Sequence, residues 1–176
     1  MKKIAIIIYG PPGSGKGTQA DLLIKASNFV NFDIGSHIEQ VVHDPKNKNN
    51  KIIQAQRKNF DTGKLCNPAW IVKLVEKSIR NIARAGLNLI LSGSLRTIFE
   101  TLGDSKIKGL IHVLEEEYGK DNIHFVLLKA RPAVSVFRNK NRLICTVCGK
   151  PVLYQNLKQT PLGCPICGGK LRVRTL

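Results

Sequence analysis

The chain has 176 residues, of which 43% are hydrophobic, and it carries a formal net charge of +16. This length suits one domain with a buried core and a small inserted unit. The apolar run behind Met1 spans only about six residues, too short for a secretory signal or a membrane-spanning helix. We therefore expect a cytoplasmic protein that does not associate with a membrane.

A phosphate-binding loop follows the first predicted strand. The segment Lys3–Tyr9 is apolar and β-branched, which predicts a buried strand. Residues Gly10–Gln19 read GPPGSGKGTQ and match GxxxxGK followed by Ser or Thr, except that Gly17 precedes Thr18. Backbone amides and the N-terminus of the next helix bind phosphate in such a loop. A turn without nucleotide is the alternative. We predict ATP binding by Gly10, Pro11, Pro12, Gly13, Ser14, Gly15, Lys16, Gly17 and Thr18.

Strands and helices alternate along the chain. The first helix is predicted over 19–26, with Leu22 and Leu23 facing the core. An amphipathic helix begins at Asn67-Pro68 and closes at Gly86, and its apolar face carries Ile71, Leu74, Val75 and Ile79. Further strands are expected at 28–34, 87–91 and 123–128, and further helices at 36–42, 54–59, 106–118 and from Pro132. The alternation predicts a parallel sheet covered by helices on both faces.

Four of the five cysteines form two pairs with metal-ligand spacing. Cys145 and Cys148 form one CxxC pair, Cys164 and Cys167 form the other, and fifteen residues separate the pairs. This spacing is typical of a structural zinc site with four thiolate ligands and no open position for water. Two disulfides are the alternative, which a reducing compartment disfavours. We expect the remaining cysteine, Cys66, to be a small apolar residue.

The positive charge is concentrated in the last third of the chain. From Asp121 to Leu176 there are ten Lys or Arg residues and a single acidic residue, Asp121. This excess indicates a polyanionic ligand. A triphosphate, a nucleic acid and a merely solvated basic face are the alternatives, and the phosphate-binding loop favours the triphosphate.

The loop GPPGSGKGTQ closely resembles that of adenylate kinases, which also have a glycine between the lysine and the threonine. Collinear resemblances continue at Asp61–Leu65, at Ser92–Thr97, at Arg138 and Arg142, and in a cysteine-bearing lid that closes with Leu171–Arg174. The resemblance implies a P-loop NTPase-type α/β fold, with a parallel sheet flanked by helices and an inserted zinc-ribbon lid with four cysteine ligands. It also implies transfer of the ATP γ-phosphoryl group to a nucleoside monophosphate, most simply AMP, with Mg²⁺ beside the structural Zn²⁺.

The resemblance assigns a role to several residues. It implies that Lys16 contacts the β- and γ-phosphates of ATP and that Arg96 holds the monophosphate. Arg138 and Arg142 are four residues apart on a predicted helix, so both are expected to point toward one polyanion. The catalytic residues implied are Lys16, Arg96, Arg138 and Arg142, with Arg138 also in the ATP site. The monophosphate site implied consists of Gly35, Gly93, Arg96, Glu100, Arg142 and Arg174.

The chain departs from the family pattern at four informative positions. Ser92 replaces an aspartate that organises magnesium, and Ile34 and Glu39 replace a threonine and an arginine that bind the monophosphate. Glu100 replaces the glutamine that reads adenine. An ionised carboxylate only accepts hydrogen bonds, so Glu100 suits the N–H groups of guanine better than the N1 lone pair of adenine.

The domain organisation expected from the resemblance has three parts. A kinase core spans 1–141 and includes a monophosphate-binding segment at about 34–66, the zinc-binding lid spans 142–173, and residues 174–176 begin a C-terminal core region. Relatives continue with another helix, a strand and a helix, so we expect the sheet to lack its fifth strand. We expect a monomer, with a partner or a second copy covering the sheet if that strand is absent.

Three functions follow from these features. The favoured one is an active nucleoside monophosphate kinase. The second is a nucleotide-binding protein that has lost turnover, as Ser92 and Glu39 suggest. The third is a zinc-ribbon module that binds nucleic acid, which ranks last because the basic region has few aromatic residues.

Overall fold

A computed structural model describes residues 2–26, 28–93, 95–152 and 161–173 of the chain. The chain divides into two compact units. The first, the core unit, comprises Met1–Gly10 and Gly15–Leu128, and the second, the cysteine unit, comprises Pro11–Ser14 and Lys129–Leu176. The expected boundary between residues 141 and 142 stays a prediction, and Arg174 lies outside the described residues.

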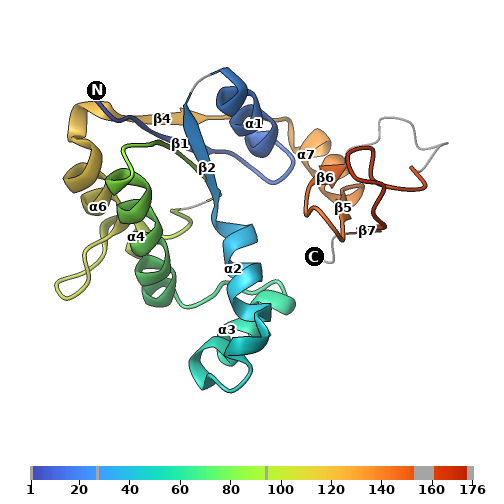
Figure 1. Ribbon diagram of the computed structural model, residues 1–176, viewed down its shortest axis with the longest axis horizontal. Coiled ribbons are helices and arrows are strands. Elements are labelled where there is room, and N and C mark those ends of the chain that lie inside the picture. Colours follow the sequence, from blue (N-terminus) through green and yellow to red (C-terminus); the bar gives the residue numbers. More distant parts are fainter. Residues whose placement is uncertain (1, 27, 94, 153–160, 174–176) are drawn as a thin grey trace. The chain divides into compact units, whose positions relative to one another are not determined.

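A parallel four-stranded sheet forms the centre of the core unit (Figure 1). Its strands are β1 (Ala5–Tyr9), β2 (Phe29–Asp33), β3 (Asn88–Ser92) and β4 (Ile123–Leu127), in the order β2-β3-β1-β4. Every neighbouring pair of strands is parallel. This confirms the α/β fold class, because parallel strands need the helical crossovers that the alternating pattern predicts.

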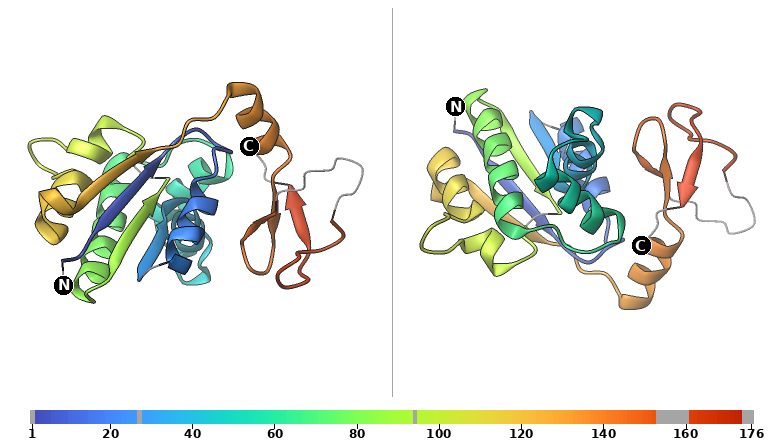
Figure 2. Two further views of the ribbon diagram at one scale, coloured as in Figure 1. Left: turned by 90° about the horizontal axis from the view of Figure 1, so that it is seen from above. Right: turned by 90° about the horizontal axis from the view of Figure 1, so that it is seen from below.

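Three helices pack against one face of the sheet. They are α4 (Pro68–Arg84), α5 (Ile98–Leu102) and α6 (Leu110–Tyr118), and Figure 2 shows α4 and α6 side by side. The Asn67 side chain accepts a hydrogen bond from the N–H of Trp70 and so caps α4. The predicted apolar face of α4 is buried at Ile71, Val75 and Ile79. These side chains join alternate residues of β1 and β3 in the main hydrophobic cluster.

Helix α1 (Lys16–Ala26) covers the other face of the sheet, where Ala20 packs against Ile8 and Ile90. The prediction that Leu22 faces the core is wrong, since its side chain is 53% exposed whereas Ala20 is fully buried. Leu22 is two positions after Ala20, which is about 200° around a helix, so burial of Ala20 turns Leu22 outward. Leu23, one turn beyond Ala20, is partly buried as predicted.

Side-chain caps shift other predicted boundaries. Helix α2 (Ile34–His43) takes Ile34 from the predicted strand, because the Asp33 carboxylate accepts from the N–H of Ser36. Helix α3 (Lys51–Asp61) is longer than predicted and is capped by the Asn50 side chain. Helix α6 begins at Leu110 rather than at 106, because the Asp104 carboxylate binds the next backbone N–H groups in a turn. Helix α5 was not predicted from the sequence.

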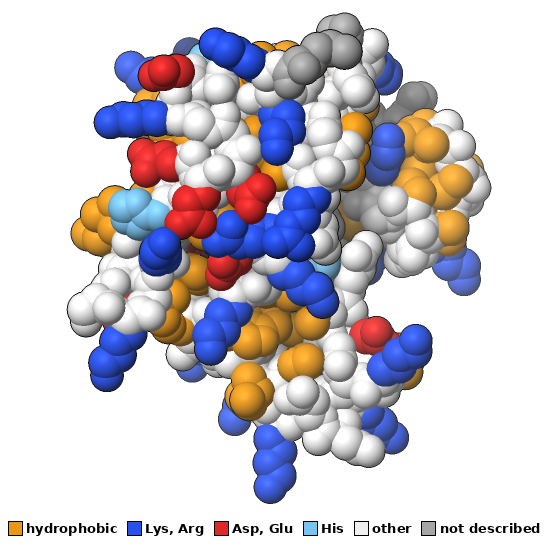
Figure 3. Space-filling view, turned by 60° about the vertical axis from the view of Figure 1, so that its left-hand side comes forward, with side chains coloured by type: hydrophobic (Ala, Val, Ile, Leu, Met, Phe, Trp, Pro, Cys, Tyr) orange, Lys and Arg blue, Asp and Glu red, His pale blue; other side chains and the backbone are white. Residues whose placement is uncertain are grey.

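An ion-pair cluster ties α4 to α6. Figure 3 shows one face of the molecule on which acidic and basic side chains lie next to one another. The Arg80 guanidinium contacts Glu76 at 2.9 Å, Glu116 at 2.9 Å and Glu117 at 2.8 Å. Hydrogen bonds from Lys108 and Arg80 lower the pKa of Glu116 to about 2. The same acidic partners raise the pKa of Arg80, so the cluster stays charged at neutral pH.

The cysteine unit contains one helix and a small antiparallel sheet. Helix α7 (Pro132–Lys140) is followed by β5 (Leu143–Cys145), β6 (Pro151–Val152) and β7 (Leu171–Val173), which form a sheet in the order β6-β5-β7. Among the described residues of this unit, the apolar cluster comprises Leu143, Cys145, Val152, Cys164 and the partly buried Leu171. A cluster of this size contributes little stability, so a cross-link or a metal would add to it. Among the described residues, no helix combines the length and the apolar character that crossing a membrane requires.

Candidate functional site

The loop between β1 and α1 has the backbone conformation of a phosphate-binding loop. Gly10, Gly13 and Gly15 all adopt positive φ angles, of 148°, 77° and 97°. L-residues avoid this region, so these three glycines permit the path of the loop. Helix α1 begins at Lys16, whose Nζ donates to the carbonyl oxygen of Gly10 at 2.7 Å. The ammonium group is thus held over the start of its own loop.

Within the cysteine unit, helix α7 packs directly on Pro12 and Gly13. The Ser135 hydroxyl donates to the carbonyl oxygen of Pro12, and Arg138 Nη1 donates to that of Gly13 at 3.4 Å. A Cβ atom on Gly13 would lie 2.9 Å from the carbonyl oxygen of Ser135. Sequence reasoning missed Ser135, because no motif links residues so far apart in the chain. The Ser14 hydroxyl is buried without a hydrogen-bond partner among the described residues, and so it can still bind a ligand.

The carboxyl ends of β2 and β3 bring Asp33 and Ser92 together, since the two residues are partners in the parallel register. Ser92 is 2% exposed, and its hydroxyl donates to Asn31 Oδ1 at 3.0 Å. Asp33 is exposed, and its carboxylate also caps α2. Ligands of open α/β sheets bind at this edge. Asp33 is a candidate that the sequence analysis missed, although an acidic residue at the end of a predicted strand was a usable signal.

A short loop after β3 carries Arg96. The Arg96 Nε donates to the carbonyl oxygen of Gly93 at 3.0 Å, and the backbone N–H of Arg96 donates to Glu100 Oε2 at 2.8 Å. Leu95 has a φ of 57°, an uncommon conformation for leucine that costs about 1–2 kcal/mol. Thr97 caps α5 by accepting from the N–H of Glu100 at 3.1 Å. Hydrogen bonds to Glu100 and Gly93 therefore hold the backbone and the Nε of Arg96, and the Arg96 side chain is exposed.

The position of Glu100 limits its expected role in reading a base. Its side chain is only 4% exposed, and one carboxylate oxygen already accepts a hydrogen bond from the backbone N–H of Arg96.

Two further residues of interest lie at the start of α2. Ile34 belongs to the main hydrophobic cluster, and Gly35 lies in the first turn of the helix. A Cβ atom on Gly35 would lie 3.2 Å from Asp33 Oδ1, so this glycine leaves room for the cap.

The two lid arginines do not share a helix. Helix α7 contains Arg138 but ends at Lys140, and Arg142 lies beyond it, just before β5. The prediction that both arginines stand on one helix is therefore wrong. Asn141 ends the helix with φ of −98° and ψ of 17°, after which the chain becomes extended. The expected roles of both arginines stay predictions.

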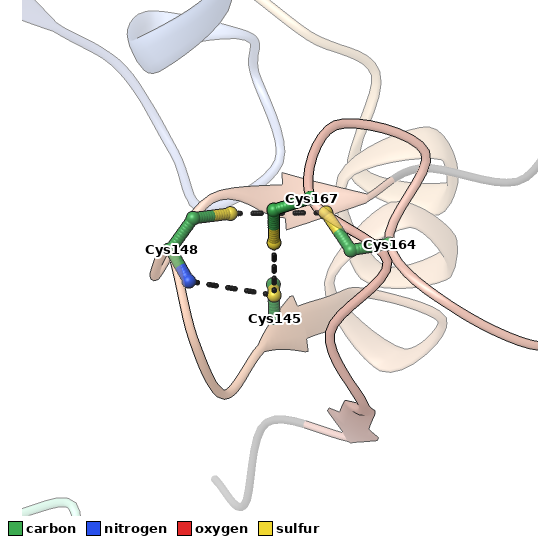
Figure 4. Close-up of side chains that lie close together, drawn as sticks. All are labelled: Cys145, Cys148, Cys164 and Cys167. Carbon is green, nitrogen blue, oxygen red and sulfur yellow. Dashed lines mark hydrogen bonds between the residues drawn. The ribbon is translucent and has the colours of Figure 1, made fainter.

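The four paired cysteines converge on one point (Figure 4). Their sulfur atoms all lie within 4.8 Å of one another, with Cys145 Sγ 3.5 Å from Cys167 Sγ and Cys148 Sγ 3.7 Å from Cys164 Sγ. Each pair belongs to a tight turn in which backbone N–H groups point back at sulfur, such as that of Val147 toward Cys145 at 3.4 Å. This arrangement can hold a metal ion.

The thiol pKa values show why a cation suits this cluster. The backbone N–H groups of Cys148 and Val147 lower the pKa of Cys145 to about 6, and the N–H of Ile166 lowers that of Cys164. At Cys167 the N–H of Gly169 also acts to lower the pKa, but neighbouring sulfur atoms and burial outweigh it and raise the value to about 12. Four thiolates this close need a bound cation to exist together.

Cys66 lies apart from this cluster, in the core unit. It is 7% exposed, and its thiol donates to the carbonyl oxygen of Gln56 at 3.6 Å. Burial raises its pKa, the nearby charge of Arg96 lowers it by less, and the charge of Glu100 raises it further. Cys66 is therefore a packed, protonated side chain, as predicted.

Comparisons with known proteins agree with this arrangement. The model of the family described as AAA domain matches residues 9–142. An adenylate kinase of Wolbachia sp. subsp. Drosophila simulans (strain wRi) is 29% identical over 155 residues, 88% of this chain and 67% of that protein. The adenylate kinase of Blochmanniella pennsylvanica is 31% identical over 121 residues, 68% of this chain and 54% of that protein. That of Geobacter sulfurreducens is 27% identical over 176 residues, 96% of this chain and 73% of that protein.

The parallel sheet, the glycine-rich loop and Lys16 at the start of α1 define a P-loop protein of the NTPase type. The chain belongs to the AAA-domain family, whose model covers most of its length. The relatives named above are adenylate kinases, from which the chain has diverged to 27–31% identity, and the chain carries a tetra-cysteine cluster near its C-terminal end. It spans between 54% and 73% of the length of the three relatives named above.

Proposed function

We propose that the chain is a nucleoside monophosphate kinase that transfers the γ-phosphoryl group of ATP to a nucleoside monophosphate. We propose AMP as this monophosphate. The observation that carries this proposal is the loop Gly10–Lys16 with its three positive-φ glycines and its folded-back lysine. The adenylate kinase names of the relatives support the choice of substrates. We also propose that it acts as a monomer.

Phosphoryl transfer depends mainly on positioning and on cations that balance the developing charge. In this proposal Lys16 leaves the carbonyl oxygen of Gly10 and binds the β- and γ-phosphates of ATP, while the loop amides bind their oxygen atoms. Arg96 holds the monophosphate, and the hydrogen bond from its backbone N–H to Glu100 helps to position it. Arg138 and Arg142 belong to the lid and bind phosphate oxygens of the substrates. The lid excludes water from the reaction.

We propose that the cysteine cluster holds a structural Zn²⁺ ion. Tetrahedral zinc with bonds of about 2.3 Å requires sulfur atoms about 3.8 Å apart. The two closest sulfur pairs, at 3.5 Å and 3.7 Å, are near this value. With four protein ligands, the ion would stabilise the cysteine unit and take no part in the reaction.

The residues present also suit a magnesium ion that accompanies ATP. Thr18 is exposed at the start of α1, and Asp33 is exposed at the carboxyl end of β2, where it is the register partner of the neutral Ser92. Magnesium prefers oxygen ligands and keeps several waters. We propose that Thr18 and Asp33 interact with its ligand shell. When bound, the ion supplies charge that balances the transferring phosphoryl group.

Diphosphate formation from ATP, Mg²⁺ and a panel of AMP, GMP, CMP and UMP tests this function. The proposal predicts turnover with at least one monophosphate and its loss in the variant Lys16→Met. ATP binding without turnover on any monophosphate would contradict it. The panel also tests base choice, since the carboxylate of Glu100 favours GMP if it faces the base.

A nucleotide-binding protein without turnover is the second candidate. Two residues favour it. The neutral hydroxyl of Ser92 already donates a hydrogen bond to Asn31, and Glu39 brings a negative charge to α2. It predicts that ATP raises the melting temperature of the protein while no monophosphate does. A second increase with any monophosphate would exclude it.

A further inference from the structure

The cysteine unit has an unusual charge distribution. Between Lys129 and Leu176 there are ten Lys or Arg residues and no Asp or Glu. Such a unit repels itself electrostatically and attracts polyanions. Even with zinc bound, four thiolates and one Zn²⁺ would offset only two of these charges. The remaining excess is larger than a nucleotide needs, because Arg138 and Arg142 are the only described cations of this unit that the proposed reaction uses.

Three other cations of the unit gather around the first cysteine turn, Cys145–Cys148. The carbonyl oxygen of Lys150 accepts from the N–H of Cys145 at 3.1 Å, and that of Lys170 accepts from the N–H of Thr146 at 2.9 Å. Lys150 and Lys170 therefore flank the turn on its two sides. Arg172 follows on β7, where it is the register partner of Ile144. The side chains of Lys150, Lys170 and Arg172 are all exposed.

The spacing of these cations suits a repeating phosphate chain. Lys170 immediately precedes β7, and Arg172 is the middle residue of that strand, so the two cations are two residues apart and at most about 6.8 Å apart along the chain. Two nucleotides of a B-form strand rise by about the same distance, at about 3.4 Å per phosphate on each strand. A repeating phosphate chain can therefore contact both cations in succession.

From this geometry we propose that the face around the Cys145–Cys148 turn binds the phosphodiester backbone of nucleic acid, without reading bases. We name this face the turn surface and define it by Lys150, Lys170 and Arg172. Base readout is not part of the proposal, because the exposed side chains at the tips of the two cysteine turns are the aliphatic Val147 and Ile166, not aromatic rings on which bases stack. The proposal goes beyond the kinase function and does not depend on it.

Binding of the full-length, zinc-loaded chain to a fluorescent 20-nucleotide single strand of mixed sequence tests the proposal by anisotropy, at a series of NaCl concentrations. RNA, DNA and duplex DNA arms distinguish the source of the phosphates. The test variant is K150Q/K170Q/R172Q. The control is K73Q/K77Q/K120Q, which removes the same charge from exposed residues of the core unit outside the expected monophosphate-binding segment.

We expect salt-dependent binding to one or more of these nucleic acids in the presence of saturating ATP. The plot of log K against log salt has a negative slope. Loss of three phosphate contacts in K150Q/K170Q/R172Q should reduce the magnitude of this slope by about 2, and the control triple should leave it unchanged. Both triples should retain the phosphotransfer activity of the unmodified chain, because neither removes a residue of the proposed reaction.

Equal weakening by both triple variants would overturn the proposal, since overall charge would then explain the binding. Displacement of the oligonucleotide by ATP would also overturn it, because the phosphates would then occupy the nucleotide site. Binding to vesicles containing phosphatidylserine, with no binding to any nucleic acid, would identify the turn surface as a membrane contact instead. In that case Ile166→Ser would weaken vesicle binding, as an inserted apolar side chain requires.

Discussion

Three alanine substitutions in the phosphate-binding loop separate backbone strain, packing and ligand contact. Gly17 has no positive φ, and a Cβ there meets nothing within 4 Å. Gly15 has φ of 97° with equally open surroundings. Gly13 has φ of 77°, and a Cβ there would lie 2.9 Å from Ser135 O and 3.1 Å from Arg138 Cβ. Alanine is therefore free of both costs at Gly17, meets only backbone strain at Gly15, and meets backbone strain and a steric clash at Gly13.

The expected changes in the free energy of unfolding follow from these environments. Gly17→Ala should stabilise the protein by about 0.5–1 kcal/mol, because alanine suits a helix better and loses less chain entropy. Gly15→Ala should destabilise it by about 1–2 kcal/mol through the left-handed backbone alone. Gly13→Ala should cost about 2–5 kcal/mol, since a steric cost of about 1–3 kcal/mol is added to the same strain.

Urea denaturation of the three variants measures these values, and calorimetry with ATP completes the design. Gly17→Ala is the informative case, because it should fold better and yet bind ATP more weakly, as a Cβ would occupy space meant for phosphate. A Gly13→Ala protein as stable as Gly17→Ala would refute the packing of α7 on the loop. Unchanged ATP affinity in Gly17→Ala would refute the close approach of phosphate to α1.

Three further substitutions test the magnesium, zinc and ion-pair assignments. Asp33→Asn should fold normally, because asparagine caps a helix as well as aspartate does. The Mg²⁺ concentration that gives half-maximal activity should rise by about tenfold. An unchanged Mg²⁺ requirement would show that Asp33 does not belong to the magnesium site. Cys164→Ser should abolish zinc binding, as measured by elemental analysis. It should also abolish the protection of β5 and β7 against hydrogen exchange, while β1 and β3 stay protected. One zinc ion still bound per chain would contradict the four-thiolate site. The pKa of Glu116 lies below its unfolded value, so its ion pairs stabilise the protein above about pH 4.5, and this stabilisation is lost as the pH falls toward 2. Arg80→Met should therefore lower the melting temperature at pH 7 by more than at pH 3, and an equal decrease at both values would disprove the pairing.

Much of the core unit could be predicted from local sequence. The β-branched run before Gly10 and the alternation of strands with amphipathic helices specify a parallel sheet, and the apolar spacing of α4 identifies its buried face. The two CxxC pairs likewise specify which thiols meet. These signals are local or periodic, so they survive without any knowledge of tertiary contacts.

The features that the sequence analysis missed depend on side-chain caps and distant contacts. Asp33 and Asp104 bind backbone N–H groups and so moved the starts of α2 and α6. The end of α7 before Arg142 separates two arginines that a continuous helix would have aligned. Ser135 contacts Pro12 across 123 positions of the chain, a pairing that only the fold creates.

Isothermal titration of ATP into the zinc-loaded chain, beside Lys16→Met, tests the central claim most directly. The claim is that the loop after β1 holds the phosphates of ATP with the Lys16 ammonium. It predicts saturable binding of one ATP per chain, weakened by about 10–100-fold when that charged hydrogen-bond donor is removed. The absence of ATP binding by the folded chain, or equal affinity in Lys16→Met, would contradict it.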